Sequence, residues 1–316
     1  MDDGETGESP RPTSFAGVLE ECPATEDLPE DEPAPEGLVA VLGAGTMGHG
    51  IAQLMAMAGH PVRLQDVDPE ALEHAVARIR DNLEQGVELE KVAPMTRDGA
   101  LSRLTTCSTV SEAAAGAAVV IEAVPEDLEL KQEVLAEAAA HAADDALLAS
   151  NTSSLSITDL AAALEPRERV VGTHFFNPVH IMDLVEVVRG DESDPRQVAR
   201  AVALAREADK TPIVVCDSPG FASSRLGVVL GLEAIRMLQE GVASAEDIDQ
   251  AMELGYNHPI GPLRLTDLVG LDTRLEIARY LDSELEGDRF EPPELLVEMV
   301  EEGRLGRKSG EGFYQW

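Results

Sequence analysis

Hydrophobic and polar positions follow two alternating periods between residues 38 and 216. Short apolar runs, typical of buried strands, are separated by longer segments in which apolar residues recur every three to four positions, as in amphipathic helices. This alternation predicts a doubly wound, mostly parallel sheet with helices on both faces, the Rossmann type of α/β fold. The predicted strands cover residues 38–43, 62–66, 104–107, 118–124, 146–150, 169–175, 184–188 and 212–216.

The strand pattern stops after Asp217. Residues 224–241, 245–255 and 265–285 all have helical periodicity, which predicts a smaller all-helical domain. We therefore expect a Rossmann-type domain over residues 37–217 and a helical domain over residues 218–316. Residues 1–36 are rich in acidic residues and proline and poor in large apolar residues, so they are predicted to form a disordered acidic tail.

The charge balance limits the classes of partner. Sixty acidic residues against 24 basic ones give a formal net charge of −36, which argues against nucleic-acid binding. At molar salt the Debye length falls to ~3 Å, so the self-repulsion of such a surface largely vanishes. The composition therefore resembles that of proteins from salt-accumulating halophiles, with an acidic mesophilic protein as the alternative.

The location of the protein is inferred from what the sequence contains. No apolar run approaches the ~18 residues of a membrane span, and no export signal opens the chain. The cysteines, Cys22, Cys107 and Cys216, have no metal-like spacing, and we expect them to be free thiols in a reducing cytoplasm. The histidines, cysteines and acids form no cluster with metal-ligand spacing, so no metal is expected.

A glycine fingerprint follows the first predicted strand. Gly43, Gly45 and Gly48 form a GxGxxG pattern that opens a helix, and Asp66 ends the next strand 18 residues after the last glycine. In this context the pattern predicts a dinucleotide site, with the pyrophosphate at the helix N-terminus. An acid at position 66 would accept hydrogen bonds from the adenosine ribose and repel a 2′-phosphate, which favours NAD over NADP. The alternative is that the three glycines serve only helix packing.

A histidine and a glutamate stand out in "THFFNPVHIMDLVEVV", residues 173–188. His174 could take a proton near neutral pH, and a carboxylate on its far nitrogen would fix its tautomer. Glu186 is placed in an apolar strand, where a charge is costly unless it is paired. From the residues alone, an acid–base pair remains open beside a buried histidine near a turn and an edge charge.

Seven segments in order give the chain a resemblance to a known family. They are "GAGTMGHGIA", "VIEAVPEDLELK", "SNTSSLSI", "GTHFFNPVHIMDLVEVV", "SPGF" followed by "SR", "HPIGPLRLTDLVGLD" and "GRKSGEGFY". Over residues 38–316 the chain resembles the 3-hydroxyacyl-CoA dehydrogenases of the 3-hydroxybutyryl-CoA type. The resemblance implies an NAD-dependent oxidation of (S)-3-hydroxyacyl-CoA, and a homodimer formed through a helical domain that also binds substrate. It also implies that His174 and Glu186 are the catalytic pair.

The resemblance also implies roles for other positions. Ser153 and Ser224 would hold substrate oxygens. The remaining matches concern the cofactor: Thr46 and Met47 in the glycine turn, Glu126 and Lys131 beside the ribose and nicotinamide, Asn151 at a strand end, and Lys308 near the cofactor. For Lys308, a solvated charge at a helix end is the alternative.

Two departures from the family pattern leave the class of substrate undecided. Ser224 is found where the family usually has an asparagine that bonds the substrate carbonyl, and the helix after Asp66 is acidic where relatives often carry lysines for the CoA phosphates, leaving Arg78, Arg80 and Lys91. A dehydrogenase of a free hydroxy acid or sugar acid, similar to gulonate dehydrogenases, is therefore a second hypothesis. A catalytically silent NAD-binding interaction protein is a third.

Overall fold

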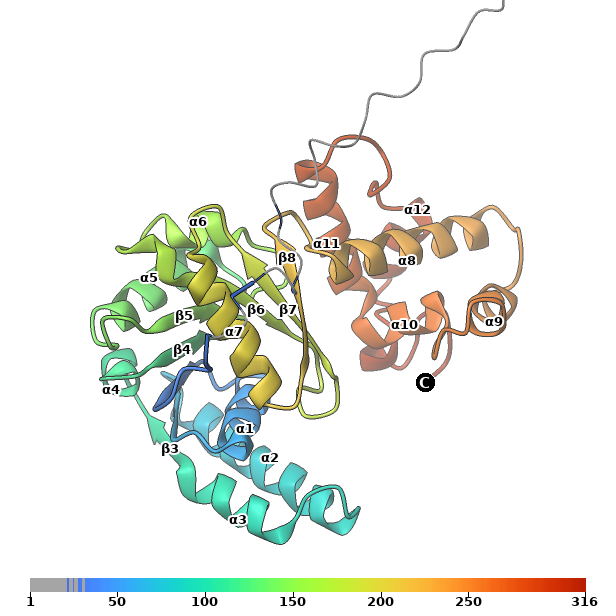
Figure 1. The fold of residues 1–316 in the computed structure, drawn as a ribbon. Coiled ribbons are helices and arrows are strands. Elements are labelled where there is room, and N and C mark those ends of the chain that lie inside the picture. Colours follow the sequence, from blue (N-terminus) through green and yellow to red (C-terminus); the bar gives the residue numbers. More distant parts are fainter. Residues whose placement is uncertain (1–21, 23–24, 26–27, 30–31) are drawn as a thin grey trace, which may run out of the picture.

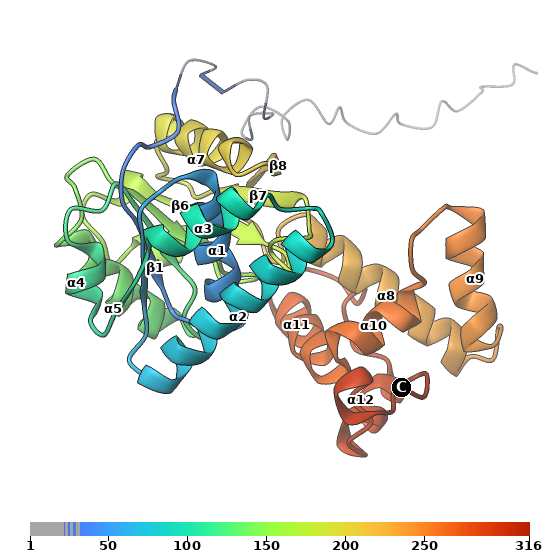
Figure 2. The ribbon, with the colours of Figure 1, turned by 90° about the horizontal axis from the view of Figure 1, so that it is seen from below.

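The computed structural model describes residues 22, 25, 28–29 and 32–316. In this part of the chain a sheet domain and a helical domain lie side by side (Figures 1 and 2). Among the described residues, no helix combines the length and the apolar character needed to span a bilayer.

The sheet has eight strands in the order β3-β2-β1-β4-β5-β6-β7-β8. Neighbouring strands are parallel except β6 and β7, which pair antiparallel, so the predicted doubly wound and mostly parallel sheet is confirmed. The strands are β1 (Val39–Leu42), β2 (Val62–Gln65), β3 (Leu104–Cys107), β4 (Val119–Glu122), β5 (Leu147–Ser150), β6 (Val170–Phe175), β7 (Leu184–Arg189) and β8 (Thr211–Cys216).

Helices cover both faces of the sheet, and the side chains of each strand alternate between two cores. In β1, Val39 and Val41 pack in one apolar cluster, while Ala40 and Leu42 pack in the other. The first cluster contains residues of α1 (Gly48–Ala58), α2 (Pro69–Glu88), α3 (Pro94–Arg103) and α7 (Pro195–Glu207). The second contains residues of α4 (Val110–Ala114), α5 (Leu128–Ala139) and α6 (Ile157–Ala161).

Only helices follow the sheet domain, and they enclose a third apolar cluster. They are α8 (Ser223–Gln239), α9 (Ala245–Gly255), α10 (Pro262–Val269), α11 (Leu271–Glu284) and α12 (Glu294–Glu301). The helical pattern over 265–285 corresponds to two helices, because Gly270 adopts φ 103° and separates α10 from α11. Helices α3 and α12 were not expected from the sequence.

The prediction that residues 1–36 form a disordered tail is wrong for the residues of this segment that the structure describes. Leu28 is 8% exposed and belongs to a core cluster of the sheet domain. The Thr25 hydroxyl accepts a hydrogen bond of 2.9 Å from the Val214 amide, and Glu32 forms an ion pair with Arg196. These contacts offset the entropy cost of ordering the segment, and they could not be read from its composition. Residues 1–21, 23–24, 26–27 and 30–31 lie outside the described part of the chain.

The expectation of three free thiols is also wrong. Cys22 and Cys216 form a disulfide, with their Cα atoms 5.6 Å apart and a sequence separation of 194. The bond ties the N-terminal segment to the last residue of β8. Cys107 is free and buried. The sequence could not reveal the pair because Cys22 reaches β8 only through the packing of the segment just described.

Candidate active site

The glycine turn between β1 and α1 leaves room that no other residue type would leave. A Cβ on Gly43 would lie 2.6 Å from the Ala123 carbonyl oxygen, and a Cβ on Gly48 would overlap the Gly43 carbonyl oxygen. Gly43 also has φ 97°, a backbone conformation that favours glycine. Nothing lies within 4 Å of a Cβ position on Gly45, so the space beside it is open to a ligand. Packing thus explains Gly43 and Gly48, whereas Gly45 faces the open space.

Asp66 follows β2 and holds the same turn. Its Oδ2 accepts a hydrogen bond of 2.8 Å from the Ala44 amide, and its Oδ1 accepts one of 3.0 Å from the Asp68 amide. The carboxylate therefore faces the glycine turn in a fixed orientation, as an acid that is to meet a ribose requires.

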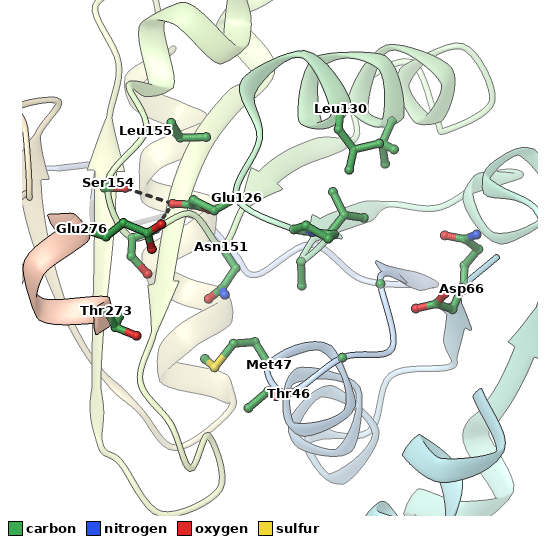
Figure 3. A pocket seen from close by; sticks show the side chains of 18 of the residues that line it. Thr46, Met47, Asp66, Glu126, Leu130, Asn151, Ser154, Leu155, Thr273 and Glu276 are labelled. Carbon is green, nitrogen blue, oxygen red and sulfur yellow. Dashed lines mark hydrogen bonds between the residues drawn. The ribbon is translucent and has the colours of Figure 1, made fainter. Parts of the chain in front are cut away.

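A cavity of about 910 Å³ lies at the carboxyl ends of the central strands, where open α/β sheets bind their ligands. Figure 3 shows Asp66 at one end and Glu126 and Asn151 farther along. The sheet-domain lining includes the predicted residues Gly43, Gly45, Thr46, Met47, Asp66, Glu126, Asn151 and Ser153. The helical domain adds Thr273, Glu276, Ile277 and Tyr280 from α11.

Glu126 is held in place by several donors at this cavity. Its Oε1 accepts hydrogen bonds from the Thr152 hydroxyl at 2.6 Å, the Ser153 amide at 3.0 Å and the Ser154 hydroxyl at 3.2 Å. Burial raises the pKa of Glu126, but the charge of Lys131 and these hydrogen bonds outweigh it, and the net shift is downward. Glu126 is therefore an ionised group at neutral pH with a fixed position.

Lys131 is 1% exposed and does not line the cavity. Its Nζ lies 2.8 Å from Glu122 Oε1 and 3.3 Å from Glu126 Oε2, and it donates to the Val124 carbonyl oxygen at 3.1 Å. The lysine thus supports two lining residues, Val124 and Glu126, from below.

The antiparallel pairing of β6 with β7 brings His174 and Glu186 together. They are direct cross-strand partners, so their side chains lie on the same face of the sheet. His174 Nδ1 lies 2.7 Å from Glu186 Oε2. His174 is 6% exposed and Glu186 is fully buried, and the ring centroids of His174 and Phe176 are 4.5 Å apart. A neutral imidazole that donates from Nδ1 keeps Nε2 as a proton acceptor, so the pair has the arrangement of a general base with an orienting carboxylate.

The N-terminus of α8 completes the surroundings of Glu186. Oε1 accepts hydrogen bonds from the amides of Ala222 at 3.1 Å and Ser223 at 2.8 Å, and Oε2 accepts one of 2.7 Å from the Ser223 hydroxyl. Burial raises the pKa of Glu186, but the hydrogen bonds from His174 and Ser223 outweigh it and the net shift is downward. The carboxylate of the sheet domain is therefore held by the first turn of the helical domain.

Comparison with known proteins identifies the chain. Residues 38–218 match the family model described as 3-hydroxyacyl-CoA dehydrogenase, NAD binding domain, and residues 220–316 match that of its C-terminal domain. The chain belongs to the 3-hydroxyacyl-CoA dehydrogenase family. Its cofactor is accordingly NAD, and its fold and enzyme class are those expected from the sequence.

Individual relatives extend the similarity over nearly their whole length. The chain is 43% identical over 278 residues to a probable 3-hydroxybutyryl-CoA dehydrogenase of Bacillus subtilis (strain 168), covering 88% of this chain and 96% of the relative. It is 44% identical over 280 residues to the 3-hydroxybutyryl-CoA dehydrogenase of Mycobacterium tuberculosis (strain ATCC 25618 / H37Rv), covering 88% and 98%. The crystal structure of (S)-3-hydroxybutyryl-CoA dehydrogenase from Ralstonia eutropha superimposes with a TM-score of 0.85 at 40% identity, covering 88% of this chain and 98% of that chain.

Not every residue matched to this dehydrogenase family reaches the cavity. His174, Glu186 and Ser224 are not among its lining residues. Asn151 connects the two places, because it lines the cavity and its Oδ1 accepts a hydrogen bond of 2.9 Å from the amide of Phe175, next to His174. Ser224 is partly buried in the first turn of α8.

Lys308 also lies outside the cavity lining. It is in a short 3₁₀ helix, Arg307–Ser309, and its Nζ donates a hydrogen bond of 2.6 Å to Asp272 Oδ2 at the start of α11. The lysine ties the C-terminal segment to α11, the helix that provides four lining residues.

Two residues that support the site, Glu122 and Ser223, were not predicted from the sequence. Glu122 is fully buried at the end of β4, and it accepts hydrogen bonds from Lys131 at 2.8 Å and the Ser150 hydroxyl at 2.6 Å. The signal that identified Glu186, an acid within an apolar strand, was present at Glu122 as well. Ser223 carried no such signal, because the family pattern directs attention to position 224.

Proposed function

We propose that this member of the family catalyses the reversible oxidation of short-chain (S)-3-hydroxyacyl-CoA to 3-ketoacyl-CoA, with His174 and Glu186 as its catalytic pair. The observation that carries this proposal is the 2.7 Å contact between His174 Nδ1 and Glu186 Oε2. His174 precedes Phe175, the last residue of β6, whose amide donates a hydrogen bond to Asn151 in the cavity lining. The relatives named as 3-hydroxybutyryl-CoA dehydrogenases support a short acyl chain.

The proton leaves through His174. Its Nε2 accepts the proton of the substrate 3-hydroxyl group while the C3 hydride is transferred, and the ring becomes an imidazolium. Glu186 accepts the Nδ1 hydrogen bond, fixes the ring orientation and stabilises the positive charge on it. Ser153 and Ser224 are proposed to hold the substrate oxygens. NAD, when bound, supplies the hydride acceptor.

The proposed cofactor site uses the open space beside Gly45. The α1 N-terminus and the turn residues Thr46 and Met47 would bind the pyrophosphate, and Asp66 the adenosine ribose. Glu126 and Asn151 would line the nicotinamide side. Lys131 would act only through Glu126, and for Lys308 the ion pair with Asp272 favours a structural role.

The test is reduction of acetoacetyl-CoA by NADH at molar KCl, followed by NADH absorbance. His174→Gln should lower kcat by ~10²–10⁴-fold because the proton-transfer group is lost, while NADH binding persists. The control is His141→Gln, which changes an exposed histidine and should leave kcat unaltered. Undiminished turnover in His174→Gln would refute the mechanism.

A free hydroxy acid is the second candidate substrate, favoured by Ser224 and by the acidic α2. A substrate panel separates the two candidates, since turnover of a free acid with none of an acyl-CoA would favour the second. Measurable turnover of either class would exclude a catalytically silent NAD-binding protein.

The oligomeric state and location are part of the same proposal. Large apolar side chains are exposed on the helical domain, including Leu226 (67%), Leu254 (80%) and Tyr256 (75%), and they support a homodimer through this domain. Light scattering coupled to size-exclusion chromatography, at high and low salt, tests it.

The protein is also proposed to be cytoplasmic, a location where thiols are kept reduced. Alkylation of freshly lysed cells tests this location, because it shows whether Cys22 and Cys216 are free thiols or disulfide-bonded in the cell.

A further inference from the structure

Arg274 is a buried charge with no partner in the described part of the chain. It lies on α11 and is 5% exposed, on the same side as the core residues Leu271, Leu275 and Ala278. Among the described residues, no carboxylate is within 4.0 Å of its guanidinium, and its Nε has no hydrogen-bond partner.

Such a group is costly to bury. A charge removed from water destabilises the fold unless an opposite charge or hydrogen bonds compensate for it. Burial lowers the pKa of Arg274 to about 10, so the guanidinium is still charged at neutral pH. An apolar residue would fill the same space without that cost, and packing alone therefore does not explain an arginine.

Two glycines of α8 show where the side chain points. A Cβ on Gly231 would lie 3.4 Å from Arg274 Nε and 3.5 Å from Cζ, whereas a Cβ on Gly227 would lie 3.9 Å from Nη1. The guanidinium therefore extends along α8 from Gly231 toward Gly227, in the direction of the helix N-terminus. Both glycines therefore lie at van der Waals distance from the guanidinium.

The next turn of α8 carries Ser223 and Ser224. They precede Gly227 by four and three residues, so they flank it about one helical turn, ~5.4 Å, closer to the catalytic pair. Ser223 holds Glu186, and Ser224 occupies the position proposed to bind the substrate carbonyl group. The unpaired guanidinium thus lies one turn behind the proposed substrate site.

The geometry points to Arg274 as a substrate-specificity residue that binds a carboxylate of the substrate. This inference rests on the proposed function, because it places the substrate against Ser224. A guanidinium pairs with a carboxylate through two parallel N–H···O bonds, and the burial of Arg274 would strengthen the pair. The carboxylate could belong to the far end of an acyl-CoA chain or to a free hydroxy acid.

Two matched substrates test the first source. The CoA thioester of 3-oxohexanedioic acid ends in a carboxylate, whereas 3-oxohexanoyl-CoA has the same chain length and ends in a methyl group. The wild type should prefer the former in kcat/KM by roughly 10- to 100-fold, the range for a hydrogen bond to a charged group. Free acetoacetate with NADH tests the second source.

Variants then assign the preference to the guanidinium. Arg274→Met retains an unbranched stem and should abolish the preference for the carboxylate, in the CoA pair or in free acetoacetate. Arg274→Lys retains a positive charge without the planar fork and should keep part of it. The control, Arg279→Met, removes an exposed arginine from the same helix and should leave the ratio of the two kcat/KM values unaltered.

The outcomes separate this inference from the proposed function. If acetoacetyl-CoA is reduced but neither the six-carbon pair nor free acetoacetate reveals a carboxylate preference, Arg274 is a packing residue and only the inference fails. A preference that survives in Arg274→Met also overturns it. If acetoacetyl-CoA is not reduced at all, the proposed function fails. In that case, free-acid turnover by the wild type that is lost in Arg274→Met but not in Arg279→Met would still support a carboxylate site.

Discussion

Two buried charges, one in each domain, are treated differently by the fold. Glu186 in the sheet domain accepts hydrogen bonds from His174 Nδ1, the Ser223 hydroxyl and the amides of Ala222 and Ser223. Arg274 in the helical domain has no partner among the described residues. The first site is complete within the chain, so it can orient a catalytic base before substrate arrives. The second is incomplete, which is the expected condition of a group whose partner is a ligand.

Removing the charge of Glu186 should have the largest effect. Glu186→Gln replaces a carboxylate that accepts from four donors with an amide that can meet some of them only with its own N–H groups. We expect kcat to fall by ~10²-fold or more and the free energy of unfolding to fall by ~1–3 kcal/mol. Urea unfolding and NADH-coupled rates measure both. Glu233→Gln, on the exposed side of α8, is the control, and an equal loss in it would contradict the assignment.

Removing the charge of Arg274 should change the stability of the ligand-free protein in the opposite direction. Arg274→Met eliminates an uncompensated buried charge while retaining much of the apolar stem, so the ligand-free protein should gain ~1–4 kcal/mol of stability. Thermal unfolding without substrate measures this gain. A destabilised variant would mean that the guanidinium has a structural partner, and the contrast with Glu186 would disappear.

Removing one donor from Glu186 should have the smallest effect. Ser223→Ala deletes a hydrogen bond to Oε2 but preserves both amide donors, so kcat should fall by ~2–10-fold. The hydrogen bonds of Ser223 contribute to the downward pKa shift of Glu186, so the variant should raise that pKa. The decline of kcat/KM at acidic pH would then begin at a higher pH than in the wild type. An unmoved acidic limb would indicate a purely structural serine.

The sheet was predictable because its signals are local. Val39, Ala40, Val41 and Leu42 are all fully buried, and an unbroken apolar run of this length is typical of a central parallel strand. The glycine turn was equally readable, since Gly48 packs against the Gly43 carbonyl oxygen within one strand–turn–helix unit, although Gly43 itself is restricted by Ala123, which follows β4.

The features that the residue pattern alone left open or missed depend on contacts between distant segments. His174 and Glu186 meet only because β7 runs antiparallel to β6, a direction that no local pattern indicates. The role of Ser223 depends on the contact of the first turn of α8 with Glu186 of β7, and the disulfide of Cys22 depends on the contact of its segment with β8. Arg274 lies in an amphipathic helix where arginine is ordinary, and its isolation follows from packing against Gly227 and Gly231.

The pairing of β6 with β7 makes the relative position of His174 and Glu186 independent of the length of the connection between the two strands. Residues 176–183 join the two strands, while the ladder from Gly172↔Val188 to Phe175↔Val185 fixes the position of Glu186 opposite His174. Insertions within this connection could remodel the mouth of the site without separating the two side chains. A single-residue insertion inside either strand would instead turn one of them to the opposite side of the sheet.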